Sequence, residues 1–386
     1  MDQRTIQILF PLLRSAICGA KLADEECNAF SPELLPELFA MAKKHDLAHL
    51  LALSLKQNGL IPEGRNEIEK NIFKAVFRYE RLNYEYERLC AALEKAKIAF
   101  LPLKGSFLRK YYPEPWMRTS CDIDILVHKE DLEAAISYLS ETLKYVEKEH
   151  ATHDVSLFSP EGIHVELHFD LVEEGRARNA IGILSTVWEN VSLRVGSAYW
   201  YEMSDAFFYF YHIAHMAKHF ETGGCGIRPF LDLWILDRIE GANQGARNRL
   251  LKKGGLLQFT EVSQNLSKVW FGGKEPDAVS CQLQAFLLHG GVYGSTDNRV
   301  ALNQTKKGGR FGYILSRLFI PRAKLQRYYP VLKKHPWLTS LMQVRRWFML
   351  LRPDVAAMAK SEIRSNANLE KSKADAMNDL LNNIGL

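Results

Sequence analysis

Residues 122–127 read Asp-Ile-Asp-Ile-Leu-Val, and this stretch decides the fold class. β-Branched residues are typical of strands, and successive side chains of a strand point to opposite faces. Asp122 and Asp124 therefore share one face, although two like charges so close together repel each other. A divalent cation would stabilise the pair, because such ions bind clustered carboxylate oxygens. A strand end at which two aspartates simply meet solvent would give the same pattern.

A second strand carries a matching set of side chains. Residues 163–170 read Ile-His-Val-Glu-Leu-His-Phe-Asp, and they follow a strand-like run at 155–158 and a Ser-Pro-Glu-Gly turn. Two strand-like runs around such a turn predict a β-hairpin. Alternation puts His164, Glu166, His168 and Asp170 on one face. If this strand neighbours residues 122–127, Glu166 completes a cluster of three carboxylates.

A strand-to-helix junction lies upstream of both strands. The apolar run 98–103 ends at Lys104-Gly105-Ser106, and a helix-like stretch follows. Glycine lets the backbone approach a phosphate group closely, and the free N–H groups of a helix N-terminus attract anions. Most Gly-Ser turns only reverse the chain, but the order of turn, Asp-x-Asp and third carboxylate is much more specific.

These motifs, in this order, resemble the polymerase-β-like nucleotidyltransferase superfamily and, more narrowly, the uncharacterised bacterial nucleotidyltransferase family. The resemblance covers roughly residues 95–350, and the N-terminal helices add little to it. The stretches that carry it are Leu103-Lys104-Gly105, Tyr112-Pro113, Arg118, residues 122–127, residues 165–169, Lys218-His219, Asp232, Tyr329-Pro330 and Pro336-Trp337-Leu338.

The resemblance implies an α+β fold, with a polymerase-β-like core of a small mixed sheet and helices. Strand-like and helix-like runs alternate only in the middle of the chain. We therefore expect an N-terminal helical region at 1–94, the nucleotidyltransferase core at 95–200, and a helical C-terminal domain with a polar tail at 201–386.

The resemblance also implies the chemistry. In this superfamily two Mg²⁺ ions assist attack of a hydroxyl on the α-phosphorus of a nucleoside triphosphate, and pyrophosphate leaves. ATP is the expected nucleotide, and the hydroxyl acceptor could be a small molecule, a protein side chain or RNA. Carried over to this sequence, the metal-binding and catalytic residues are Asp122, Asp124 (the bridging ligand) and Glu166, and the nucleotide-binding residues are Lys104, Gly105, Ser106, Arg118, Lys218 and His219.

Several of these residues also have simpler interpretations. Lys104 and Arg118 could be solvated cations beside a loop, and Arg228 and Asp232 could belong to a structural ion pair. His212, His215 and His219 share one helical face, yet buried, hydrogen-bonded histidines explain the first two better than zinc does. We expect Lys218 to approach the phosphates from the helices that follow the sheet.

Two other functions remain open. A transition-metal-dependent hydrolase could use His164, Glu166 and His168, because imidazole ligands favour Zn²⁺, Fe²⁺ or Mn²⁺ over Mg²⁺. A non-catalytic nucleotide-binding or partner-binding module could also be built on this fold.

Composition narrows the class of protein but names no function. The chain has 386 residues, of which 47% are hydrophobic and 25% charged, as expected of a globular protein. Its six scattered cysteines and its lack of a long apolar run predict a cytoplasmic protein without a transmembrane segment. Residues 306–352 hold twelve Lys or Arg and no acid, which leaves −7 on the rest of a chain of net charge +5. This segment could contact a polyanion, or pack on the acidic remainder of the protein.

Overall fold

The computed structural model describes residues 3–61, 66–172, 178–221, 223–292, 294–307, 309–349, 360, 364, 366 and 371–386. The chain forms two compact units: Met1–Lys218 with Ile227–Ser280, and His219–Gly226 with Cys281–Leu386. The domain boundaries predicted near residues 94 and 200 both fall inside the first unit. Among the described residues, no helix is both long enough and apolar enough to cross a membrane.

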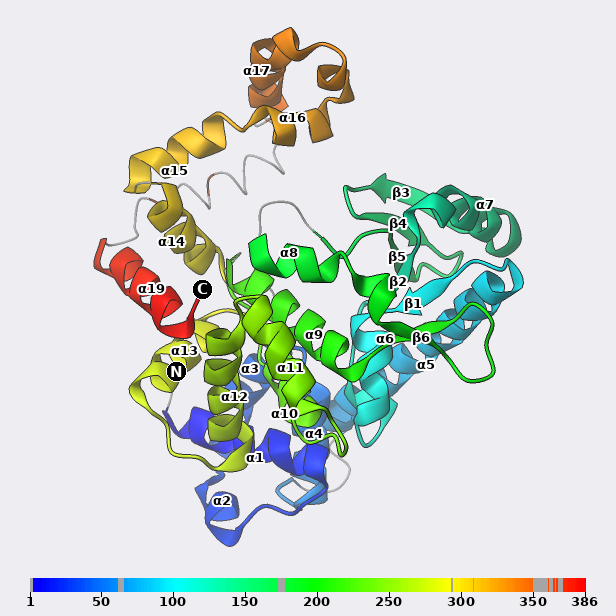
Figure 1. The fold of residues 1–386 in the computed structure, drawn as a ribbon. Helices are drawn as coiled ribbons and strands as arrows, with labels where there is room; N and C mark the ends of the chain where they lie inside the picture. Colours follow the sequence, from blue (N-terminus) through cyan, green and yellow to red (C-terminus); the bar gives the residue numbers. More distant parts are fainter. Residues whose placement is uncertain are drawn as a thin grey trace. The chain divides into compact units, whose positions relative to one another are not determined.

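A five-stranded mixed sheet lies in the first unit, in the order β1-β2-β5-β4-β3 (Figure 1). The α+β fold class is therefore confirmed. β2 and β5 pair in parallel, and every other neighbouring pair in the sheet is antiparallel. The strands are β1 (Phe100–Pro102), β2 (Asp122–Val127), β3 (Val146–His150), β4 (Asp154–Phe158) and β5 (His164–His168). The predicted hairpin is the β4–β5 pair.

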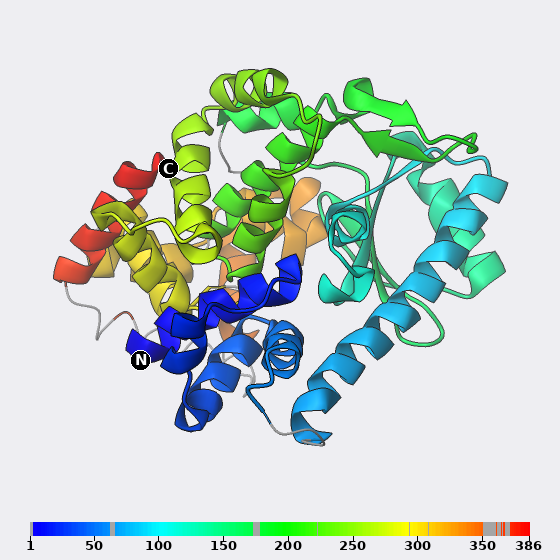
Figure 2. The same ribbon diagram turned by 90° about the horizontal axis from the view of Figure 1, so that it is seen from below.

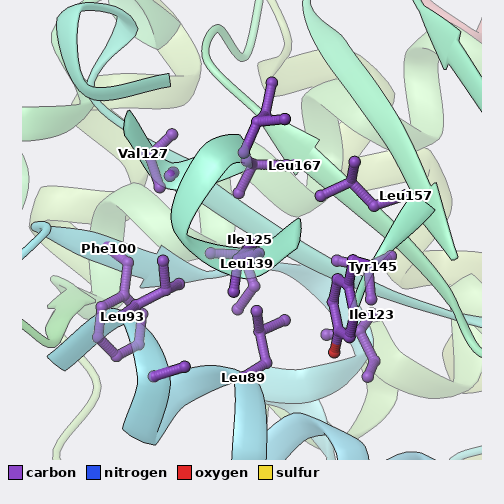
Figure 3. Close-up of a cluster of buried hydrophobic side chains, with 14 of the residues drawn as sticks. Leu89, Leu93, Phe100, Ile123, Ile125, Val127, Leu139, Tyr145, Leu157 and Leu167 are labelled. Carbon is purple, nitrogen blue, oxygen red and sulfur yellow. The ribbon is translucent and has the colours of Figure 1, made fainter. Parts of the chain in front are cut away.

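One face of this sheet is apolar and is covered by two helices, α5 (Asn66–Lys95) and α7 (Leu132–Leu143). In helix α5, apolar residues recur at steps of three and four from Ile68 onward, which is the spacing of an amphipathic helix, and Figure 2 shows it as one continuous helix. Its Leu89 and Leu93 pack on Phe100, Ile123 and Ile125 of β1 and β2 (Figure 3). Each fully buried aliphatic side chain contributes roughly 1.5–3 kcal/mol. This packing leaves only the opposite face of β2 and β5 for polar side chains.

The remaining elements of the first unit are mostly helices. A two-stranded sheet of β6 and β7 precedes α9, the helix that carries His212, His215 and His219. Elements before and around the sheet are α1 (Gln3–Cys18), α2 (Asp24–Ala29), α3 (Leu35–Lys44), α4 (Ala48–Gln57), α6 (Lys104–Leu108), α8 (Arg178–Leu184), β6 (Val191–Leu193) and β7 (Tyr201–Met203). Those after it are α9 (Asp205–Glu221), α10 (Arg228–Leu236), α11 (Gln244–Lys253) and α12 (Leu257–Gly272).

The second unit is helical where it is described. Its helices are α13 (Ala278–His289), which begins in the first unit, α14 (Thr296–Lys307), α15 (Gly309–Leu318), α16 (Arg322–Tyr328), α17 (Thr339–Met349) and α19 (Lys371–Ile384). Leu325, Tyr329, Leu332 and Met342 form a small core of their own. Within the predicted polar tail, residues 371–384 form α19, and most of residues 356–370 lie outside the described residues.

Candidate functional site

The parallel register of β2 and β5 brings the three predicted carboxylates together. Asp122 lies opposite His164, and Asp124 lies opposite Glu166. Because side chains alternate along both strands, these residues point away from the apolar core, which takes up Ile123, Ile125, Val165 and Leu167. The predicted convergence of the carboxylates from adjacent strands is therefore present in the structure.

The ligand atoms form two overlapping groups. Asp122, His164 and Glu166 lie within 4.8 Å of one another, and so do Asp124, Glu166 and His168. Glu166 is the residue that both groups share. His164 is in the group with Asp122, and His168 is in the group with Asp124. Each imidazole therefore lies beside an aspartate from β2, and His164, Glu166 and His168 of β5 do not form one such group among the described residues.

Lys104 reaches the carboxylates from the first residue of α6. Its Nζ lies 2.7 Å from Asp124 Oδ1 and 3.9 Å from Glu166 Oε2. Its backbone adopts a φ of 42°, in the left-handed region that costs a residue other than glycine about 1–3 kcal/mol. Lysine in such a conformation is uncommon, and strain of this kind concentrates at functional sites.

Asp124 is the most strongly stabilised anion of the site. It is only 4% exposed, and burial by itself would raise its pKa. Lys104 and a 3.0 Å hydrogen bond from His168 Nε2 outweigh burial and hold the pKa of Asp124 well below its usual range. Asp122 behaves in the opposite way: burial raises its pKa, and the nearby charge of Asp124 raises it further. The two aspartates thus differ in their affinity for protons, although they share one strand.

Two more cationic groups face these carboxylates. Burial would lower the pKa of His168, but its hydrogen bonds to Asp124 and Glu166 raise it. Burial lowers the pKa of Lys218 on α9 to about 8, and the charge of Lys104 lowers it too, while Glu166 and Asp124 act in the opposite direction. The charges of Lys104 and of these carboxylates act on Lys218, and its contact with the phosphates of a substrate stays a prediction.

Sequence reasoning missed two residues of the site, Asp154 and Tyr211. Asp154 on β4 lies opposite His168, and its carboxylate is 3.1 Å from His153 Nε2. Counting the hairpin register back from the turn at 159–162 would have found it. Tyr211 lies two helical turns before Lys218 on α9; burial raises its pKa, and the charges of Lys104, Asp124 and Glu166 act on it. Their spacing of seven residues on one helix was the available signal.

The structure uses Arg118 differently from the other predicted nucleotide-binding cations. Its Nε and Nη2 donate to Asp232 Oδ1 and Oδ2 at 2.7 and 2.9 Å, and its Nη1 donates to the Thr119 carbonyl. The Tyr112 hydroxyl donates to the same carboxylate at 2.6 Å. Both ends of the Arg118–Asp232 pair are buried. This is the structural ion pair that the sequence allowed for Asp232, and Arg118 rather than Arg228 is its cation.

The other nucleotide-binding candidates lie in different surroundings. Gly105 is buried, and a Cβ added there would contact Ser120 and Arg118 at 3.4–3.5 Å. Ser106 lines a cavity of about 320 Å³ together with Pro102, Lys110 and Trp200 among others. His219 follows Lys218 on α9 and belongs to the second compact unit. Roles for these three residues remain predictions.

The donor set fits divalent cations. Carboxylate oxygens from Asp122, Asp124 and Glu166 are the ligands that Mg²⁺ takes in proteins. The imidazoles of His164 and His168 beside them also suit transition metals. Lys104 adds positive charge beside these carboxylates, and its charge and that of Lys218 influence each other, which suits an anionic, phosphate-bearing substrate.

Comparison with known proteins identifies the family. The model of a family described as "Uncharacterised nucleotidyltransferase" matches residues 32–272. The match begins in the N-terminal helices, which we expected to contribute little, and it ends before the Tyr329-Pro330 and Pro336-Trp337-Leu338 stretches assigned to the resemblance. No curated protein and no solved structure matches the chain significantly. Since the matched residues make up more than half of the chain and include both carboxylate strands, the chain belongs to this nucleotidyltransferase family.

Proposed function

We propose that the protein transfers a nucleoside monophosphate from a nucleoside triphosphate to a hydroxyl group, in a reaction that depends on Mg²⁺ and releases pyrophosphate. The observation that carries the proposal is the parallel register that puts Asp124 beside Glu166 and Asp122 one step along the same face. Three carboxylates held by two buried strands are a preformed site for divalent ions. ATP is the expected nucleotide.

Each residue of the site has a part in this reaction. Asp122, Asp124 and Glu166 would hold two Mg²⁺ ions, which, when bound, stabilise charge on the attacking and leaving oxygens. Glu166 belongs to both groups of ligands and Asp124 is the most buried of the three carboxylates, so these two residues would contribute most to holding the ions. His168, whose Nε2 donates to Asp124, orients that carboxylate.

The balance of charge explains why lysines are needed in addition to the metal ions. A nucleoside triphosphate brings about four negative charges to a site that already holds three carboxylates, and two Mg²⁺ ions offset about four of the seven. Lys104 and Lys218 supply further positive charge from two different elements, α6 and α9. Cations fixed in place before the substrate binds stabilise the developing charge without reorganisation.

The direct test is to titrate the purified protein with each of the four nucleoside triphosphates, with and without Mg²⁺, and to follow binding and pyrophosphate release. The proposal expects binding that needs Mg²⁺, and pyrophosphate release once an acceptor hydroxyl is present. Purification with a tightly held transition metal and no response to nucleotides would favour the hydrolase built on His164, Glu166 and His168. Mg²⁺-dependent binding without pyrophosphate release under any acceptor would favour the non-catalytic nucleotide-binding module.

A further inference from the structure

The second unit carries a surface that the proposed reaction does not use. We infer that residues 309–349, called here the basic-apolar segment, bind the surface of an anionic lipid bilayer. The inference rests on the charge, the exposed apolar side chains and the internal packing of this segment, and is independent of the chemistry at the carboxylates.

The charge of the segment has one sign only. Its 41 residues contain no Asp or Glu. They contain nine basic residues, which are Arg310, Arg317, Arg322, Lys324, Arg327, Lys333, Lys334, Arg345 and Arg346. Lys324, Lys333 and Lys334 are exposed. Basic clusters of this density are attracted to membranes with anionic lipids over distances of about one Debye length.

The same segment exposes most of the large apolar side chains found on the surface of the described chain. Eleven of the seventeen such residues lie in it, although it makes up about a tenth of the sequence. They are Phe311, Ile314, Leu315, Leu318, Phe319, Tyr328, Val331, Trp337, Leu341, Val344 and Phe348. Trp337, Phe311 and Phe348 are 76, 73 and 68% exposed. Single exposed apolar residues are ordinary in proteins, but a concentration of this kind marks a binding surface.

Helical spacing organises these side chains into stripes. On α15, Ile314, Leu315 and Leu318 follow Phe311 by three, four and seven residues, and this spacing places all four side chains on one face of the helix. Tyr313, on another side of the same helix, is buried. On α17, Leu341, Val344 and Phe348 repeat at three and seven residues. Each helix therefore carries an apolar stripe on its exposed surface, next to exposed basic residues such as Arg317 and Arg345.

Lack of an internal core does not explain this exposure. The segment has its own small core of Leu325, Tyr329, Leu332 and Met342. Helix α17 is held to the end of α15, because Trp347 Nε1 and Gln343 Nε2 donate to the carbonyls of Leu318 and Ile320 at 2.9 and 2.6 Å. The exposed stripes are not part of this small core, and so they are available to an external surface. Figure 1 shows α15 in gold and α16 and α17 in orange.

The combination of charge and apolar side chains selects the partner. A second copy of the chain would bring nine more positive charges against the same nine, so self-association through this surface is disfavoured. RNA would match the charge and could stack its bases on the exposed aromatic rings, but it would leave the aliphatic side chains of Ile314, Leu315 and Leu341 exposed to water. An anionic bilayer matches both properties: its headgroups attract the basic residues, and its acyl boundary takes up the apolar stripes. Trp337 and Tyr328 have the amphipathic rings that membrane interfaces enrich.

The test is flotation of the full-length protein with phosphatidylcholine vesicles that contain either no or about 30% phosphatidylglycerol. We expect binding to the anionic vesicles, weakened by 0.5 M salt, and little binding to the neutral ones. Phe311→Ala/Leu315→Ala/Phe348→Ala should weaken binding by roughly tenfold per large side chain removed. Lys333→Gln/Lys334→Gln should weaken it by roughly fivefold per charge.

Matched variants in the first unit provide the controls. Phe73→Ala removes a side chain that is 70% exposed on α5, and Lys252→Gln/Lys253→Gln removes two exposed charges from α11. Both should bind vesicles like the wild type. Failure of the wild-type protein to float with anionic vesicles would overturn the inference. Equal loss of binding in the control variants would also overturn it, and so would binding of RNA with no binding of vesicles.

Discussion

Removing one partner of the buried pair of Arg118 and Asp232 should be among the most destabilising single changes in the first unit. Both side chains are at most 9% exposed, and three hydrogen bonds of 2.6–2.9 Å reach the carboxylate, one of them from Tyr112. Removing one partner leaves the other charge buried without compensation, which typically costs about 3–5 kcal/mol. Asp232→Ala and Arg118→Leu should each lower the free energy of unfolding by that amount.

The magnitude can be read from urea denaturation followed by tryptophan fluorescence, because five of the seven tryptophans lie in the first unit. With an m-value of about 3 kcal/mol/M, the midpoint should shift by roughly 1–1.7 M urea. The double variant Arg118→Leu/Asp232→Leu should cost clearly less than the sum of the two single changes, because neither charge is then left unpaired. Glu69→Ala is a suitable control, since it removes half of an exposed pair with Lys56 and should cost less than about 1 kcal/mol.

This experiment separates the two interpretations of Arg118. If the residue serves the fold, its removal lowers stability, and its loss couples strongly to the loss of Asp232. Single variants within 0.5 kcal/mol of the wild type, or strictly additive costs, would refute the reasoning from the buried ion pair.

Three further predictions concern the site and the fold. Lys218→Ala should weaken triphosphate binding roughly 10–100-fold and monophosphate binding much less. Lys252→Ala is the control. Equal effects of Lys218→Ala on both ligands would exclude contact of Lys218 with the outer phosphates. Because burial holds the pKa of Lys218 at about 8, triphosphate affinity of the wild type should fall as the pH rises through this range. Burial lowers the pKa of His49 to about 4, so between pH 6.5 and 4 the unfolded chain binds one proton more than the folded chain at this residue. The free energy of unfolding should therefore fall as the pH drops through this range. His49→Gln should reduce the slope by about one proton, or roughly 1.4 kcal/mol per pH unit, in urea denaturation measured across the same range. Glu166→Gln should weaken Mg²⁺ binding in calorimetric titration at least tenfold, and unchanged Mg²⁺ affinity would remove Glu166 from the ligand set.

Strand periodicity made the central part of the site predictable. Alternation at Asp122 and Asp124, and again at His164, Glu166 and His168, fixes the face of each side chain from sequence alone. The hairpin turn at 159–162 fixes the register of β4 and β5. The long helix α5 was equally predictable from apolar residues at steps of three and four.

Ion pairs between residues distant in the sequence were not predictable in this way. Nothing local determines that Asp232 pairs with Arg118 while Arg228 lies 3.2 Å from Asp46, because several cations and carboxylates of similar chemistry compete. Strand β3 was missed because all five of its residues are exposed, so no apolar alternation marks it. The strained backbone at Lys104 comes from tertiary context, since lysine has no local preference for a positive φ.

The central claim is Mg²⁺-dependent nucleotidyl transfer at the β2–β5 carboxylates, and one comparison tests it most directly. Pyrophosphate release should be measured for the wild type, Asp124→Asn and Glu133→Gln, an exposed carboxylate on α7. Because Asp124 also compensates Lys104 and His168, the folded fraction of each variant should be measured in the same buffer and used to scale the rate. The account predicts that Asp124→Asn lowers Mg²⁺-dependent release by at least about 100-fold while Glu133→Gln keeps the wild-type rate. Wild-type release by folded Asp124→Asn protein would contradict the account.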